Sequence, residues 1–152
     1  MNPSDFKDQP RDTKKENEAS KWLRAQEEYT KFEFIWNVVK HNQLSGLAMV
    51  RKSALKRAHL EVILEYGLVY GDASNVRLWY DATVEGLGEL RAINIIESHL
   101  ENGPLIVEKM LYWLRPETEK GKLKAEELRS KFNDMYPNFR STRSTGIHAT
   151  QA

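Results

Sequence analysis

Apolar and aromatic residues recur along positions 18–41 at spacings of three and four. This spacing is typical of an amphipathic α-helix, and its regular alternation also fits a coiled-coil seam. The row consists of Trp22, Ala25, Tyr29, Phe32, Trp36 and Val39, with Ile35 and Val38 widening it near the end. The pattern predicts one long helix over 18–41, capped at its start by Asn17 or Ser20.

Helical spacing returns in five later segments, which are 46–66, 74–87, 90–101, 104–114 and 116–135. Glycine and proline residues separate these segments, as they commonly do at helix ends. A break inside the first of the five stays open as an alternative, because Ser45 and Ser53 both suit an N-cap position.

The stretch from Leu60 to Tyr70 allows two interpretations, because β-branched, aromatic and other apolar residues dominate it. Such a composition also suits a β-hairpin with its turn near Tyr66 and Gly67. We favour a helix that continues to about Tyr66, with Gly67 and Gly71 ending it.

The two ends of the chain differ in composition from its centre. Residues 1–17 are polar and contain two prolines, so we predict a flexible arm. Residues 137–152 hold small polar side chains and two arginines, so we predict a disordered tail. The segments between them predict an all-α fold, a compact bundle of five or six helices in one helical domain over 18–136.

Composition narrows the classes of protein that this chain can belong to. The 152 residues match about one domain, and the absence of cysteine excludes disulfides and thiolate sites. With 23 basic and 22 acidic residues, the net charge of +1 gives no bulk attraction for nucleic acid or membrane. The sequence has neither a signal peptide nor a long apolar run, so we expect an intracellular, cytoplasmic protein without membrane contact.

Residues that could carry chemistry do not form a known catalytic pattern. The four histidines, His41, His59, His99 and His148, include no HExxH pair that would place two imidazoles on one metal. Gly86 and Gly88 lack the preceding strand and following lysine of a phosphate-binding loop. We therefore expect a non-enzymatic protein with no catalytic residue, no metal site and no cofactor.

A basic cluster is the clearest candidate contact site for a partner. It consists of Arg51, Lys52, Lys56, Arg57 and His59, and Arg140 and Arg143 in the tail could add to it. On one continuous helix, Lys52, Lys56 and His59 would share a face and could follow the phosphates of a nucleic acid or meet a protein. The alternative is a solvated face that pairs with acidic residues of the same chain.

A second candidate surface would join copies of this chain. The residues assigned to it are the aromatic side chains Trp22, Tyr29, Phe32 and Trp36 and the acidic row Asp81, Glu85 and Glu89. Aromatic residues are enriched in protein interfaces, and an acidic row complements the basic cluster of another copy. The alternatives are that the aromatic row is the protein's own core and that the charges meet internally.

These patterns favour a self-associating helical binding or scaffold protein that contacts a protein or nucleic-acid partner. Its small size and polar ends also suit a viral or phage structural or accessory protein. One alternative is a helix-turn-helix DNA-binding regulator built from residues 43–66. Another is a helical enzyme or small-ligand binder with a pocket among Trp79, Tyr80, His99 and Trp113.

Overall fold

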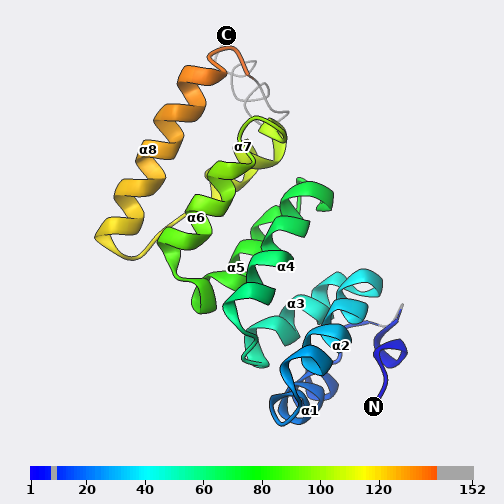
Figure 1. Ribbon diagram of the computed structural model, residues 1–152. Helices are drawn as coiled ribbons and strands as arrows, with labels where there is room; N and C mark the ends of the chain where they lie inside the picture. The colour runs from blue at the N-terminus through cyan, green and yellow to red at the C-terminus, as the bar shows by residue number, and fades with distance from the viewer. Residues whose placement is uncertain (8–9, 140–152) are drawn as a thin grey trace. The chain divides into compact units, whose positions relative to one another are not determined.

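The computed structural model describes residues 1–7 and 10–139, which contain eight α-helices, one 3-10 helix and no strand (Figure 1). The elements are η1 (Pro3–Phe6), α1 (Thr13–Arg24), α2 (Glu28–His41), α3 (Gln43–Lys52), α4 (Arg57–Tyr70), α5 (Val76–Leu87), α6 (Glu89–Ser98), α7 (Pro104–Trp113) and α8 (Glu119–Met135). The predicted all-α fold is confirmed, but five or six helices are too few. The additional helices arise because short turns divide each of the first two predicted segments.

The described chain folds as two compact units. The first unit comprises residues 1–7, 10–64 and 78–88, and the second comprises 65–77 and 89–139. The predicted helical domain over 18–136 therefore contributes residues to both units. No helix in the described residues is both long enough and apolar enough to cross a membrane.

The predicted long helix over 18–41 is divided into α1 and α2. Helix α1 ends with Ala25 as its C-cap, and Glu27 has an extended backbone before α2 begins. The buried apolar side chains of α2 are Phe34 and, near the end of the row, Ile35, Val38 and Val39. By contrast, Tyr29 is 70% exposed, and Phe32 and Trp36 are partly exposed. The part of the row from Tyr29 to Trp36 thus stays outside the core of the first unit, because the break at Ala25 changes which face of α2 is buried.

Residues 1–17, predicted as a flexible arm, contain η1 and the first turn of α1. Asn2 and Asp5 form a capping box around η1. The Asp5 side chain accepts a hydrogen bond from the Asn2 N–H, and the Asn2 side chain accepts one from the Ser4 N–H. Phe6 is 3% exposed and packs edge-on against Phe34 of α2. Capping and burial of one aromatic ring together explain why this stretch takes a defined structure.

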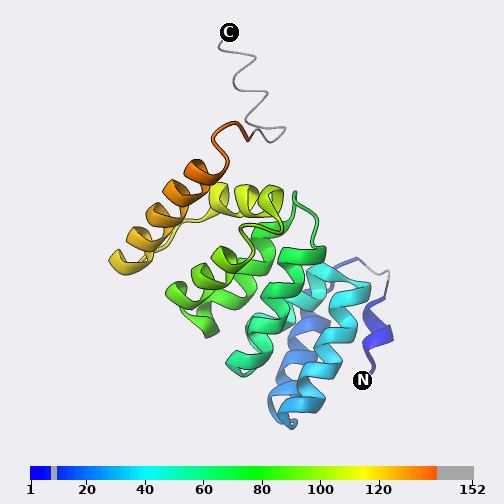
Figure 2. The same ribbon diagram turned by 45° about the horizontal axis from the view of Figure 1, so that its top comes forward.

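Helix α3 packs against both α1 and α2 in the first unit (Figures 1 and 2). A Cβ atom on Gly46 of α3 would lie 2.6 Å from both the Cα and the N of Val39, which are backbone atoms of α2. Only a glycine permits this approach, because a side chain there would collide with atoms that cannot rotate away. Asn42 begins α3, and its side chain accepts a hydrogen bond from the Ser45 N–H.

A turn of four residues, 53–56, separates α3 from α4. Ser53 is the C-cap of α3, and Ala54 follows it in the left-handed region with φ 54°. Helix α4 then continues through Gly67 to Tyr70, burying Leu60, Ile63 and Leu68. The prediction of helix over hairpin for this stretch is confirmed, although the helix ends four residues later than expected.

The second unit is built around α6, α7 and α8 (Figure 1). Its buried side chains come from all three helices, and they include Ile93, Ile96, Val107, Met110, Leu128 and Phe132. Helix α8 begins at Glu119 rather than at the predicted Pro116, because Thr118 acts as its N-cap and accepts a hydrogen bond from Gly121 N–H. The predicted disordered tail falls mainly on residues 140–152, which lie outside the described residues.

Replacement of Gly46 by alanine should destabilise the first unit, because the new Cβ would force α2 and α3 apart. We expect a loss of about 1–3 kcal/mol in the free energy of unfolding, the usual cost of overpacking a core. Chemical denaturation measures this loss. Gly86→Ala is the matched control, since its Cβ would meet only the Cδ1 end of the flexible Leu60 side chain. Equal effects of the two substitutions would contradict the close α2–α3 approach.

Replacement of Ala54 by glycine should stabilise the protein. The left-handed conformation costs an alanine roughly 1–2 kcal/mol, and a glycine avoids this cost. The greater conformational freedom of glycine in the unfolded state offsets about 0.5–1 kcal/mol of that gain in stability. Ala58→Gly, at an exposed position inside α4, should instead destabilise by up to about 1 kcal/mol. Thermal denaturation of both variants should therefore give shifts of opposite sign, and shifts of the same sign would refute the assigned turn.

Candidate partner-binding surfaces

The basic cluster does not form a single stripe in the structure. Arg51 and Lys52 end α3, Lys56 precedes α4, and Arg57 and His59 lie in the first turn of α4. The expectation that Lys52, Lys56 and His59 share one helix face is therefore wrong. The physical reason is the turn at Ala54, which separates the cluster into two helices with different directions.

Several side chains of the cluster bond to other parts of the first unit. Lys52 Nζ donates to Asn17 Oδ1 at 2.7 Å, and Arg57 Nη2 donates to the Leu87 carbonyl at 3.0 Å. The backbone N–H of Lys56 donates to Glu28 Oε1 at 2.7 Å. These contacts favour the alternative in which the cluster supports the fold. Arg140 and Arg143 lie outside the described residues.

Glu28 and His59 form a partly buried pair between α2 and α4. His59 Nδ1 lies 2.8 Å from Glu28 Oε1, and the Glu28 carboxylate lies 3.6 Å from Lys31 Nζ. Burial raises the pKa of the Glu28 carboxyl group, but the hydrogen bonds from Lys56 N–H and His59 and the charge of Lys31 outweigh it. The resulting pKa lies below its ordinary value of 4.5. This pair fixes the start of α4 against α2.

The ring of His59 also continues an aromatic stack on α2. Phe32 stacks on His59 with ring centroids 4.1 Å apart, and on Trp36 with centroids 5.7 Å apart. Tyr29 lies one turn away on the same helix and is 70% exposed. Three of the four aromatic residues predicted for self-association thus lie along α2. Trp22 lies apart from them on α1, with its ring against Phe34.

The exposed face of α2 carries charges as well as rings. Glu33 and Lys40 are exposed, and they lie seven residues apart, which places them on nearly the same line along the helix. Trp36 lies between them and is partly exposed. We call Tyr29, Glu33, Trp36 and Lys40 the α2 surface. Sequence periodicity located its aromatic residues, but its charges became apparent only when the buried face of α2 was known.

A cavity of about 580 Å³ in the first unit brings basic and acidic candidates together. Arg51 and Lys52 of α3 line it, as do Asp81 and Glu85 of α5, and Leu47 and Ala82 give it an apolar part. The opposite charges that were expected to attract a second copy therefore face one cavity within one copy. This arrangement favours the internal alternative for these four residues.

Glu89, the third member of the predicted acidic row, has a separate position in the second unit. It accepts hydrogen bonds from the backbone N–H groups of Glu117 at 2.6 Å and Thr118 at 3.0 Å, and from the Thr118 hydroxyl. Burial raises the pKa of the Glu89 carboxyl group, but these bonds and the charge of Lys122 bring it below its ordinary value. Glu89 thus secures the start of α8, because Thr118 is the N-cap of that helix.

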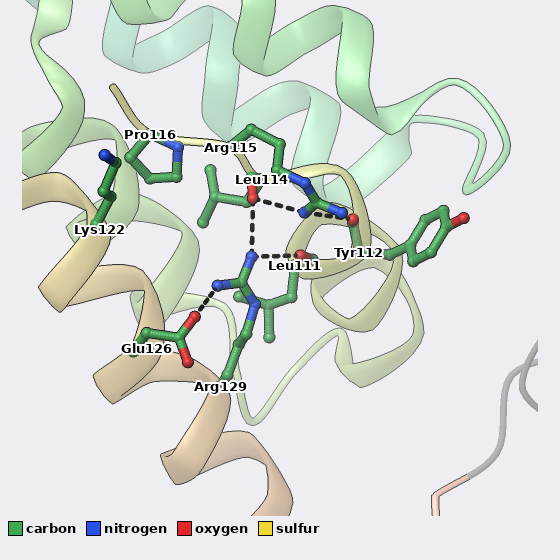
Figure 3. A pocket seen from close by; sticks show the side chains of 8 residues that line it. All are labelled: Leu111, Tyr112, Leu114, Arg115, Pro116, Lys122, Glu126 and Arg129. Atoms are coloured by element: carbon green, nitrogen blue, oxygen red, sulfur yellow. Dashed lines mark hydrogen bonds and ion pairs between the residues drawn. The ribbon is translucent and has the colours of Figure 1, made fainter. Parts of the chain in front are cut away.

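The second unit holds a basic cavity that the sequence analysis missed (Figure 3). It has a volume of about 590 Å³ and lies where α7 ends and α8 passes it. Its basic side chains are Arg115, Lys122 and Arg129. No sequence pattern pointed to these residues, because they are spread over fifteen positions and converge only when α8 folds back on α7.

The structure gives less support to the two alternative functions that the sequence left open. Helices α3 and α4 have the order of a helix-turn-helix motif, but Arg57 in the first turn of α4 already bonds to a carbonyl of α5. Trp79 and Tyr80 are buried in the first unit, and they line none of the cavities described above. His99 and Trp113 belong to the second unit. Among the described residues, no three histidine or carboxylate side chains gather closely enough to hold a metal ion.

Comparisons of the chain with protein-family models, curated protein sequences and solved structures each found no significant match.

Replacement of Glu28 by glutamine should lower stability at neutral pH by about 1 kcal/mol, the usual net contribution of an intramolecular hydrogen bond. Because the pKa of Glu28 is lower in the folded state, its contribution is complete above about pH 4.5. That contribution disappears as the pH falls through the folded-state pKa. Denaturation curves between neutral and acid pH should thus show wild type and variant converging in acid.

Glu27→Gln is the control for this experiment, because Glu27 is exposed and makes no side-chain capping hydrogen bond. Its stability difference from wild type should be small at every pH. A Glu28→Gln difference that stayed constant down to strongly acid pH would contradict the assigned pair.

Proposed function

We propose that the protein is a self-associating helical binding protein, in which the α2 surface pairs with the same surface of a second copy. The observation that carries this proposal is the combination of exposed rings and exposed opposite charges on one face of α2. Aromatic side chains bury large areas at low entropic cost, which makes them effective in interfaces. The proposal is narrower than the sequence expectation, since it leaves out the basic cluster and the acidic row.

The charges of the α2 surface specify how two copies would meet. Glu33 and Lys40 lie about 10 Å apart along the helix axis, so they cannot pair within one helix. In this arrangement a two-fold axis passes between Trp36 and Asn37, so that α2 of one copy lies antiparallel to α2 of the second copy. Glu33 of each copy then faces Lys40 of the other. The same geometry stacks Trp36 near the axis, and a self-complementary arrangement of this kind is what a closed dimer requires.

The size of the α2 surface limits the strength of this association. Helix α2 has 14 residues and a length of about 21 Å. Stable dimers bury roughly 800 Å² on each partner, and the four side chains of the α2 surface supply only part of that area. We therefore expect association that depends on concentration and on ionic strength, as suits a protein that assembles locally or together with a further partner.

Charge reversal tests this pairing. Glu33→Lys and Lys40→Glu should each weaken self-association about tenfold at low salt, because each variant replaces two attractive contacts with two repulsive ones. The double variant should restore association, since the charges are then exchanged between the helices. Analytical ultracentrifugation over a range of concentrations measures the dissociation constant.

Glu127→Lys is the matched control, because Glu127 is exposed on α8 of the second unit and undergoes the same change of charge. It should leave association unchanged. A wild-type protein that stays monomeric at every concentration and salt would refute self-association. Association that survives both single reversals would refute the α2 surface alone.

A further inference from the structure

Two arginines of the second unit converge on one carbonyl oxygen at the end of α7 (Figure 3). Arg115 Nη1 donates to the Leu114 carbonyl at 2.9 Å, and Arg129 Nη2 donates to the same oxygen at 2.8 Å. Each guanidinium also binds a second carbonyl of α7, which is that of Tyr112 for Arg115 and that of Leu111 for Arg129. The backbone therefore holds two positive groups close together.

The carbonyls explain the position of the arginines but do not balance their charge. A helix C-terminus supplies about half a negative charge. Arg129 also pairs with Glu126, which is the one carboxylate among the described residues that line the cavity. Lys122 adds a third positive charge. Its ion pair with Glu119 is weak because Glu119 is 92% exposed, and Glu89, whose pKa Lys122 lowers, does not line the cavity. The lining thus keeps an excess of positive charge.

The cavity has room and apolar surface for a small organic molecule. Its volume of about 590 Å³ lies within the range of about 300–1,000 Å³ that is usual for such sites. Leu111, Leu114 and Pro116 contribute the apolar part of the lining. Arg115 uses only Nη1 in its carbonyl bonds, so its other N–H groups can donate to a ligand.

We propose that this cavity binds the phosphate group of a small organic phosphate. The phosphate oxygens accept hydrogen bonds from the free N–H groups of Arg115, and the positive charges of Arg129 and Lys122 add to the attraction for the anion. Because the carbonyls of α7 already hold both guanidinium groups in place, little side-chain entropy is lost when the anion binds. The apolar portion of the ligand packs against Leu111 and Pro116. The site lies wholly within the second unit and does not depend on self-association.

The test is a titration of the isotope-labelled protein with phenyl phosphate, followed by amide NMR shifts at constant ionic strength. Saturable shifts should cluster in residues 111–129. Arg115→Gln should weaken binding about tenfold, as expected for the loss of a charge-assisted contact. Arg115→Lys should weaken binding less, since lysine keeps the charge but loses the forked donor. This second variant replaces Arg115→Gln in the test if the glutamine variant misfolds. Inorganic phosphate should bind more weakly than phenyl phosphate.

Lys122→Gln and Lys120→Gln form the matched pair of variants, because Lys120 lies on the same helix but does not line the cavity. Binding should fall several-fold for Lys122→Gln and stay unchanged for Lys120→Gln. Equal loss in both variants would show non-specific attraction and overturn the site. Equal binding of citrate would overturn the preference for phosphate, and the absence of any saturable shift would overturn the proposal as a whole.

Discussion

The first unit depends on the close crossing of α2 and α3 at Gly46. A glycine at this point lets the backbone of α3 reach the backbone of α2 at Val39, and this contact sets the direction of both helices. The neighbouring residue, Ser45, donates its hydroxyl to the buried carboxylate of Glu16 on α1 at 2.9 Å. Arg11 binds the same carboxylate at 2.8 Å. The crossing of α2 and α3 therefore positions the groups that hold α1 and the N-terminal segment.

Three carboxylates support the fold. Glu16 is fully buried and is bound by Arg11 and Ser45, Glu28 binds His59, and Glu89 binds the backbone that precedes α8. Each carboxylate accepts several hydrogen bonds, which offsets the cost of removing it from water. Two features of the described residues that these bonds leave exposed are one side of α2, in the first unit, and the basic cavity beside α7, in the second.

The sequence patterns succeeded where local chemistry decides the structure. Pro104 begins α7 as the predicted segment 104–114 requires, and the apolar periodicity of α7 matches the residues that it buries. The same reasoning failed for 18–41, since the regular row from Trp22 to Val39 concealed a break at Ala25. It also did not predict the 3-10 helix η1 near the N-terminus, where a single ring, Phe6, packs against α2. Whether such a ring is buried depends on a surface formed far along the chain.

By itself the sequence determined an all-α fold without cysteine chemistry, because helical periodicity and composition are local properties. It also identified the aromatic residues of α2 and the charged residues of the two candidate rows. Only the tertiary structure decided which of these face outward. The turn at Ala54 divided the basic cluster, α3 and α5 brought Arg51 and Glu85 to one cavity, and α8 brought Arg129 to Arg115. The physical reason is that a charged side chain acts according to its neighbours in space, and those neighbours come from distant segments whose packing no local pattern specifies.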